Sequence, residues 1–162
     1  MNSKIPLIGF FIAIAFLGTA VPALSQQSPP DSAKAKEIAA LVDKAAALVD
    51  SKGKSAFSEF RKSGSEWLSG DTYLFVADMK GITLFNGGFP KFEGTDRSAV
   101  KDSNGKLIDM ELRKMAQSNG SGWVDYMFPK PGQTEPSHKW TYVKAVKVDG
   151  TPEYIGAGFY PK

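Results

Sequence analysis

The chain has 162 residues, of which 42% are hydrophobic and 23% charged, a composition typical of one packed globular domain. Its 20 basic and 17 acidic residues are spread along the chain, so the sequence lacks the basic stripe of a nucleic-acid-binding protein. The absence of cysteine excludes disulfides, thiolate metal sites, a cysteine nucleophile and a lipid-modified N-terminal cysteine.

The N-terminal segment has the layout of a secretory signal peptide. Lys4 precedes an apolar run over residues 5–17, and Ala23-Leu24-Ser25 places small residues at both positions that specify cleavage. We therefore predict a signal peptide over residues 1–25, cleavage before Gln26, and a periplasmic or secreted protein. An uncleaved anchor is the alternative, but glycine and proline interrupt a run already near the lower limit of ~17 residues for a spanning helix. No later segment is apolar enough to span a bilayer, so we expect no membrane span in the mature chain.

The first part of the mature chain is predicted to be helical. Apolar residues recur at three- and four-residue spacing from Ile38 to Val49, which indicates an amphipathic helix. Asp31 or Ser32 can cap its beginning, and Gly53 is expected to end it. A second helical segment is predicted over residues 55–62.

From Tyr73 onward the pattern changes to short β-rich runs. Five strands are predicted, over residues 73–77, 82–85, 123–128, 139–148 and 153–160. Asp78-Met79-Lys80-Gly81 favours a tight turn between the first two strands, and Asp149-Gly150 favours a hairpin between the last two. A loop over residues 89–105 and a helix from Leu107 to Met115 separate the two groups of strands.

This order of elements predicts an α+β fold in which the long N-terminal helix packs on a five-stranded antiparallel sheet. The central loop and helix are expected to cover the other face of the sheet and to leave a cavity between. A polar, proline-containing tether over residues 26–30 precedes a single domain over residues 31–162.

The sequence offers no complete catalytic or metal-binding motif. His138 is the only histidine, and no Gly-x-Ser-x-Gly elbow accompanies it. Asp102-Ser103-Asn104-Gly105 begins like a calcium loop but lacks the remaining ligands, including the late glutamate. Gly156-Ala157-Gly158 has no following helix that would bind a phosphate. We therefore expect a protein that is not an enzyme and that has no catalytic residues, no metal and no cofactor.

A group of aromatic and basic residues near the end of the chain is the best candidate for binding. Strand alternation places Tyr126 and Phe128 on one face, and Lys130 follows between two prolines that stiffen its backbone. A lysine held beside two aromatic rings can bind a small anion. In the alternative interpretation, Tyr126 and Phe128 belong to the core and Lys130 is solvated. Lys139 and Tyr142 have the same ambiguity, because they lie on opposite faces of a regular strand.

Four segments of the chain resemble blocks of the single Cache domains of the second type, in the order of that family. They cover residues 73–81, 122–132, 139–144 and 155–160, and the most specific is the Tyr-x-Phe-Pro-Lys-Pro-Gly motif at residues 126–132. The resemblance implies a PAS-like extracellular sensor fold, which commonly binds small organic acids in a pocket over the sheet. In that family the domain usually belongs to chemoreceptors and histidine kinases that act in chemotaxis and signal transduction.

The resemblance also implies which residues line the pocket. The expected ligand-binding residues are Tyr73, Asn86, Tyr126, Phe128, Lys130, Lys139 and Tyr142. The family often has a histidine followed by proline after the second strand, whereas this chain has Asn86-Gly87-Gly88-Phe89-Pro90. An asparagine can donate a hydrogen bond but carries no charge.

The function expected from these observations is the capture of a small metabolite by a stand-alone, exported sensor-type domain. The ligand is expected to be a small carboxylate, bound without chemistry, and no nucleic-acid partner is expected. The alternative is an interaction module that docks on a membrane chemoreceptor or histidine kinase and has an empty pocket. Bound metabolite after purification would favour capture, and a neighbouring receptor gene would favour the module.

Overall fold

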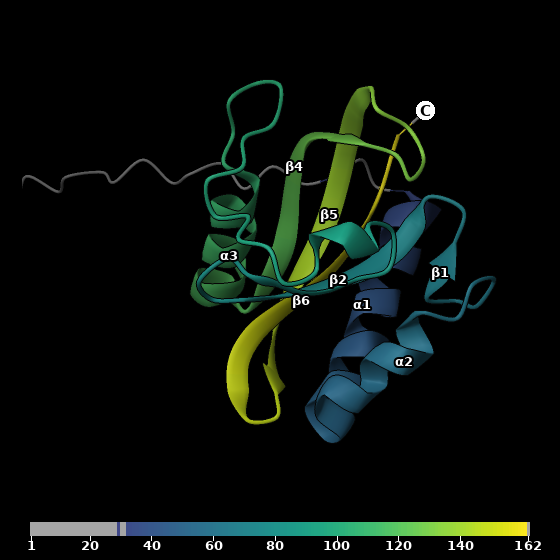
Figure 1. Cartoon of the computed structure of the whole chain (residues 1–162). Helices are drawn as coiled ribbons and strands as arrows, with labels where there is room; N and C mark the ends of the chain where they lie inside the picture. Colours follow the sequence, from purple (N-terminus) through teal and green to yellow (C-terminus); the bar gives the residue numbers. More distant parts are fainter. Residues whose placement is uncertain (1–28, 30–31, 162) are drawn as a thin grey trace, which may run out of the picture.

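The computed structural model of the chain describes Pro29 and residues 32–161. The predicted signal peptide, its cleavage site and most of the predicted tether lie outside the described residues. Within the described part, one long helix lies on one side of an antiparallel sheet, and a shorter helix with a long loop lies on the other (Figure 1). This arrangement confirms the predicted α+β fold.

Helix α1, Ala33–Lys52, begins and ends where the sequence predicted. The side chain of Ser32 accepts a hydrogen bond from the backbone amide of Ala35 at 3.1 Å, which satisfies one of the free amides of the first turn. Gly53 ends the helix with a φ of 58°, a left-handed conformation that glycine adopts without steric cost. The predicted apolar stripe faces the core: Ile38, Val42, Ala45 and Val49 are fully buried, and Leu41 and Leu48 are partly buried.

The second helical segment is shorter and more irregular than predicted. It consists of a 3₁₀-helix, η1, Gly53–Ala56, followed by a single α-turn, α2, Phe57–Phe60. Phe60 is fully buried there and packs against the ring of Trp67 at a centroid distance of 5.1 Å. The segment therefore serves to fold the chain back under α1 toward the sheet.

The sheet has six antiparallel strands, one more than the sequence predicted. They are β1 Leu68–Ser69, β2 Thr72–Asp78, β3 Thr83–Asn86, β4 Ser121–Pro129, β5 Pro136–Val148 and β6 Thr151–Phe159. The order across the sheet is β1-β2-β6-β5-β4, and β3 pairs with β2. The added strand, β1, has two residues, too few to give an alternating pattern that sequence reasoning can detect.

Both predicted hairpins are present. Strands β5 and β6 pair antiparallel through Asp149 and Gly150, with φ angles of 51° and 84°. Two successive positive φ values are the requirement of a type I′ turn, which matches the twist of the strands it joins. In the other hairpin, between β2 and β3, the Gly81 amide donates to the Asp78 carbonyl at 3.1 Å.

The two faces of the sheet have separate cores. Helix α1 covers one face, where β2 contributes Leu74 and Val76. Helix α3, Ile108–Asn119, covers the other face together with the loop that contains the short helix η2, Pro90–Phe92 (Figure 1). The cavity described below lies on the α3 side.

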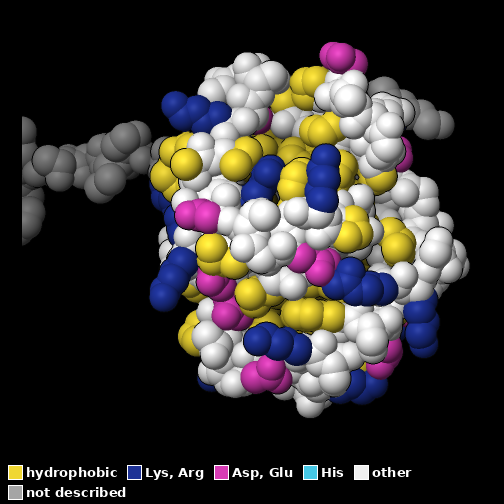
Figure 2. All heavy atoms as spheres, viewed as in Figure 1, with side chains coloured by type: hydrophobic (Ala, Val, Ile, Leu, Met, Phe, Trp, Pro, Cys, Tyr) yellow, Lys and Arg dark blue, Asp and Glu magenta, His cyan; other side chains and the backbone are white. Residues whose placement is uncertain are grey.

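The surface of the described part shows no segregation of charge on the face in view. Basic and acidic side chains are interspersed over it, and apolar side chains gather around two basic ones in its upper half (Figure 2). Among the described residues, no helix is long and apolar enough to cross a membrane.

Candidate functional site

A cavity lies between the sheet and the cover formed by α3 and the loop over residues 87–107. It has a volume of about 60 Å³, compared with roughly 10–15 Å³ needed for a single water on the same scale. Its lining comes from β2, β3, β4, β5, β6, α3 and the loop. The lining residues are Tyr73, Phe75, Ala77, Thr83, Asn86, Phe92, Arg97, Val100, Ile108, Asp109, Leu112, Tyr126, Phe128, Lys139 and Tyr154.

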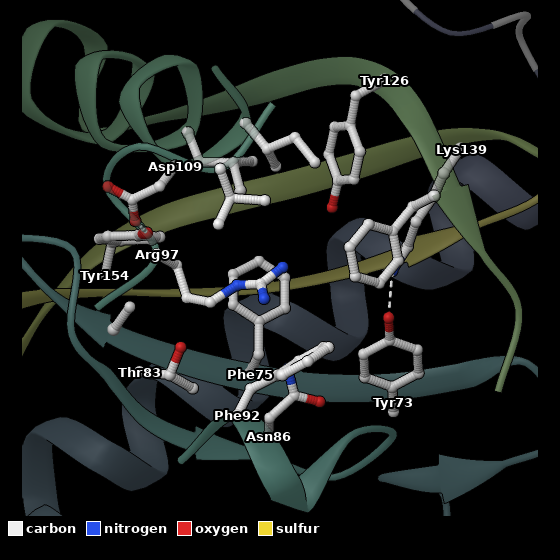
Figure 3. A pocket seen from close by; sticks show the side chains of 15 residues that line it. Tyr73, Phe75, Thr83, Asn86, Phe92, Arg97, Asp109, Tyr126, Lys139 and Tyr154 are labelled. Atoms are coloured by element: carbon white, nitrogen blue, oxygen red, sulfur yellow. Dashed lines mark hydrogen bonds between the residues drawn. The ribbon is translucent and has the colours of Figure 1, made fainter. Parts of the chain in front are cut away.

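Lys139 is the most buried charged side chain of the cavity. It lies on β5, directly opposite Tyr126 of β4, and only 1% of the residue is exposed. Its amine donates a hydrogen bond to the hydroxyl of Tyr73 at 2.7 Å (Figure 3). No ion pair of the described residues involves Lys139, so a basic group lies inside the protein without a bound carboxylate.

Aromatic rings surround the amine of Lys139. It lies 4.2 Å from the ring centre of Tyr73 and 5.4 Å from those of Phe128 and Tyr160. The rings favour the charged amine through their negative faces, but they also exclude water. Burial lowers the pKa of Lys139 to about 7, against a weaker opposing effect of the negative charge of Asp71.

Arg97 supplies a second cation. It comes from the loop between η2 and α3, and its guanidinium lies over the ring of Phe92 with its central carbon 4.0 Å from the ring centre. Figure 3 shows the guanidinium extending into the middle of the cavity, in front of Phe75. Partial burial lowers the pKa of Arg97, but an arginine keeps its charge in proteins. Arg97 therefore presents a fixed positive charge to any ligand in the cavity.

Tyr126 places a hydroxyl between the two cations. The hydroxyl forms a hydrogen bond of 2.9 Å with Thr141, and in Figure 3 it points toward the middle of the cavity. Burial raises the pKa of Tyr126 to about 12, so the hydroxyl keeps its proton at neutral pH and can donate or accept. The aromatic ring belongs to the core on the α3 side.

Asn86 lies at the end of β3 and shapes the loop that follows. Its side-chain oxygen accepts from the Phe89 amide at 2.8 Å, and its own backbone amide donates to Glu93 at 2.9 Å. The oxygen is therefore occupied by the turn, which leaves the side-chain nitrogen as the group able to contact a ligand.

The far end of the cavity is acidic. Asp109, in the first turn of α3, is 5% exposed and accepts a hydrogen bond from the hydroxyl of Tyr154. Its other oxygen, Oδ2, has no hydrogen bond in the described structure and lies 3.8 Å from the Arg113 guanidinium. Burial raises the pKa of Asp109, against the opposing effects of Tyr154 and Arg113. The cavity is thus cationic at one end and acidic at the other.

The structure brings five of the seven predicted binding residues to this cavity. These are Tyr73, Asn86, Tyr126, Phe128 and Lys139. Lys130 lies outside the lining, with its amine 3.4 Å from Asp71 and its side chain 32% exposed. Tyr142 lies on the α1 face, where its hydroxyl donates to Ser121 at 3.0 Å, because three residues along a strand reverse the direction of the side chain.

Sequence reasoning missed several lining residues. Arg97 lies in a loop without periodicity, so no spacing could have placed it in the cavity. The position of Asp109 in the sequence does carry a signal. It precedes Leu112 and Ala116 by three and seven positions, so a carboxylate stands on the buried stripe of a helix. Phe75 follows Tyr73 by two residues and shares its face.

Among the described residues, no cluster of histidine, aspartate and glutamate side chains is suited to hold a metal ion. His138 lies 3.1 Å from Asp125 on the opposite face from the cavity, and it is exposed. Asp125 also accepts from Lys106 at 2.8 Å, so this group is a surface ion-pair network.

The sequence profile named Single Cache domain 2 matches residues 20–161. The chain belongs to this family. Part of the chain is also 32% identical to the methyl-accepting chemotaxis protein McpP of Pseudomonas putida, over 90 residues. That alignment covers 56% of this chain and only 16% of the receptor, so it concerns one segment of a much longer protein.

Three solved structures have a similar fold. One, described as the structural basis for carboxylic acid recognition by a Cache chemosensory domain, has a TM-score of 0.68 and 26% identity, covering 80% of this chain and 95% of that one. A periplasmic sensor domain of a chemotaxis protein has a TM-score of 0.61 and 27% identity, covering 76% and 88%. A methyl-accepting chemotaxis protein from Vibrio parahaemolyticus has a TM-score of 0.64 over 79% and 88%, but its 21% identity supports the fold alone.

Proposed function

We propose that this Cache domain is a sensor-type binding protein that captures and releases a small carboxylate in the cavity beneath α3, without converting it into a product. The observation that carries the proposal is the pair of basic groups, Arg97 and Lys139, that line one cavity and form no ion pair within 4 Å among the described residues. A buried positive charge is costly unless it is paired. A ligand carboxylate would supply the missing partner.

The size of the cavity limits the ligand. About 60 Å³ corresponds to a few water-sized units, which favours acids of about two to four carbons. The walls include Phe75, Val100, Ile108 and Leu112, which can contact a short alkyl group. The hydroxyl of Tyr126 can hydrogen-bond a carboxylate oxygen beside the basic groups.

The relatives support the same ligand class. The structural neighbour with a TM-score of 0.68 is described as recognising carboxylic acids, and it is 26% identical to this chain. Arg97 and Lys139 of this chain are the direct support for a carboxylate here, and the similarity to that structure adds to it.

Calorimetry and thermal unfolding with acetate, propionate and butyrate test the proposal. Each acid is compared with its primary amide, which has nearly the same shape but no negative charge. We expect an acid to bind and its amide to fail, with stabilisation of about 2.7 kcal/mol at one hundred times the dissociation constant. If no small carboxylate binds, or if acids and amides bind equally, the proposal is wrong.

Two variants locate the site. Arg97→Met removes the fixed charge of the cavity, and we expect it to weaken binding by roughly 10- to 100-fold, the range of a lost charge-assisted hydrogen bond. Lys130→Met is the matched control, because Lys130 is a cation that pairs with Asp71 outside the cavity lining. Equal losses in the two variants would contradict this location and restore the role predicted for Lys130 from the sequence.

We further propose that the domain acts in the periplasm or outside the cell, in the service of a membrane receptor or kinase. The relatives named as chemotaxis proteins and as a periplasmic sensor domain support this context. The predicted signal peptide gives a direct test, since mass spectrometry of the protein from its host should find Gln26 near the N-terminus. Intact Met1 in the membrane fraction would show an anchored protein instead.

A further inference from the structure

Lys139 is the only basic side chain of the described residues that is almost fully buried. Its one hydrogen bond within the described part of the chain is to the hydroxyl of Tyr73. Burial raises the pKa of Tyr73 well above its usual value, so this hydroxyl stays protonated and brings no negative charge to the pair. The amine therefore lies in an aromatic enclosure where no described carboxylate forms an ion pair with it, and only the weaker effect of Asp71 favours its charged form.

Such surroundings make a lysine less basic and leave more of it in the reactive neutral form. A neutral amine is a nucleophile, whereas an ammonium ion is not, and desolvation in an apolar pocket is one way in which proteins activate a lysine toward carbonyl groups. With a pKa of about 7, Lys139 is largely neutral slightly above neutrality. A solvent-exposed lysine with the ordinary pKa is only ~0.1% neutral at the same pH.

The cavity can also orient a carbonyl compound. Arg97 extends into its middle, while Lys139 and Tyr73 lie at one end (Figure 3). A ligand that carries a carboxylate next to a ketone or aldehyde can place its charge on Arg97 and its carbonyl carbon toward the amine. Two-oxo acids of two to four carbons have this arrangement and suit a cavity of about 60 Å³.

We propose that the cavity binds small 2-oxo acids as a reversible imine with the amine of Lys139. The inference rests on the proposed function in one respect, since Arg97 is taken to hold the carboxylate. It goes beyond that function because the bond to Lys139 is covalent, and because it selects acids with a carbonyl next to the carboxylate.

The bond-forming steps need no oxidant or further reactant. The nitrogen of Lys139 attacks the carbonyl carbon, a carbon–nitrogen bond forms, and the π electrons of the carbonyl move to its oxygen. That oxygen takes a proton, for which the protonated hydroxyls of Tyr73 and Tyr126 on the cavity wall are available donors. The nitrogen gives up its two protons in turn, one to restore the hydroxyl that donated and one to the departing oxygen, which leaves as water and gives the imine. Addition of water reverses the steps and releases the acid unchanged.

Reductive trapping tests the proposal on the full chain. The protein is incubated with pyruvate at about pH 7.5 in the presence of cyanoborohydride, which reduces an imine to a stable amine, and the labelled residue is found by peptide mass mapping. We expect one label per chain, on Lys139, formed at least roughly tenfold faster than on a solvent-exposed lysine of ordinary pKa. Lactate, which lacks the carbonyl, should give no label, and an excess of propionate should slow the reaction.

Two variants and two outcomes make the test decisive. Lys139→Met should abolish the label, and Lys130→Met should leave it unchanged. Labels spread over exposed lysines, and equally present in Lys139→Met, would overturn the proposal. Pyruvate that stabilises the protein but leaves Lys139 unlabelled would also overturn it, while the proposed carboxylate binding would stand. Failure of every carboxylate to bind would instead reject the proposed function.

Discussion

The amine of Lys139 lies 2.7 Å from the hydroxyl of Tyr73, across strands that are separated by β6 in the sheet. Sixty-six residues separate the two along the chain. The contact joins β5 to β2 over the glycine-rich end of β6, where Gly158 has no side chain to block it. An added β-carbon at Gly158 would lie 2.7 Å from Cε of Lys139.

The first prediction concerns the close approach at Gly158. Gly158→Ala would place a methyl group 2.4 Å from the Trp140 carbonyl oxygen as well as against Lys139, and backbone cannot move aside at low cost. We expect a loss of about 1–3 kcal/mol in the free energy of unfolding, the usual cost of overpacking. Chemical denaturation measures it. Gly87→Ala is the control, because its nearest non-neighbouring atom is 3.5 Å away. Equal stability of the two variants would contradict the prediction.

The second prediction is that Lys139 makes the unliganded protein more stable as the pH rises above neutrality. Its pKa is about 7 in the folded protein and ~10.4 in an unfolded chain, so the unfolded state binds more protons between these values. Stability should therefore rise from about pH 7 to about pH 10, with a slope of at most ~1.4 kcal/mol per pH unit. Denaturation at several pH values measures it, and Lys139→Met should remove the slope. A decline in stability over this range that Lys139→Met leaves unchanged would show that Lys139 is not the cause.

The third prediction is that Glu153 makes the protein less stable as the pH rises, the opposite of the effect of Lys139. It lies opposite Asp78 in the sheet, is 5% exposed, and has one oxygen without a hydrogen bond in the described structure. Burial, with the charge of Asp78, raises its pKa to about 7, so the folded state binds more protons than the unfolded state from about pH 4.5 to about pH 7. The free energy of unfolding should therefore fall as the pH rises through this window.

Glu153→Gln should therefore stabilise the protein at about pH 8, by roughly 1–3 kcal/mol, and change little at about pH 5. Glu66→Gln is the control, because Glu66 is exposed and its ion pair with Lys44 lies on the surface. Denaturation midpoints of both variants and the wild type at about pH 5 and pH 8 measure the difference. A destabilised Glu153→Gln at pH 8 would mean that the carboxylate has a partner that compensates its burial.

The sequence predicted most of the fold because its signals were local. The spacing of Ile38 to Val49 and the Asp149-Gly150 turn depend only on neighbouring residues, and both are confirmed. The alternation that separated Lys139 from Tyr142 is also confirmed, with the first on the cavity side and the second under α1. Period-two alternation holds wherever a strand is regular.

The site was harder to predict because it depends on contacts between distant segments. Arg97 reaches the cavity through a loop whose path is set by its backbone hydrogen bond to Gly81 and not by any repeat. Lys130 shows the opposite error, because the sequence placed it in the site and the structure does not. Its place beside Tyr126 and Phe128 along the chain suggested one site, but β4 ends before it and its amine lies near Asp71 instead. Proximity along the sequence at a strand end does not fix the direction of a side chain.

The last prediction concerns the pH dependence of carboxylate binding. Lys139 must be protonated to attract a carboxylate, and its pKa of about 7 rises when an anion binds beside it. Affinity for propionate should therefore be highest between about pH 5 and pH 7, where the acid is ionised and Lys139 is charged, and should fall by up to tenfold per pH unit above that. Calorimetry in buffers of different ionisation enthalpy should detect uptake of a proton near pH 7.5.

Lys139→Met separates this effect from the fixed charge of Arg97. The variant should bind propionate more weakly at about pH 6 and lose the pH dependence, because the arginine keeps its charge throughout the range. Arg97→Met should bind more weakly at every pH while the decline above neutrality persists. A wild-type affinity that stays constant from about pH 6 to pH 9 would show that Lys139 does not take part in binding the acid, and Arg97 would then act as the sole cation for the ligand.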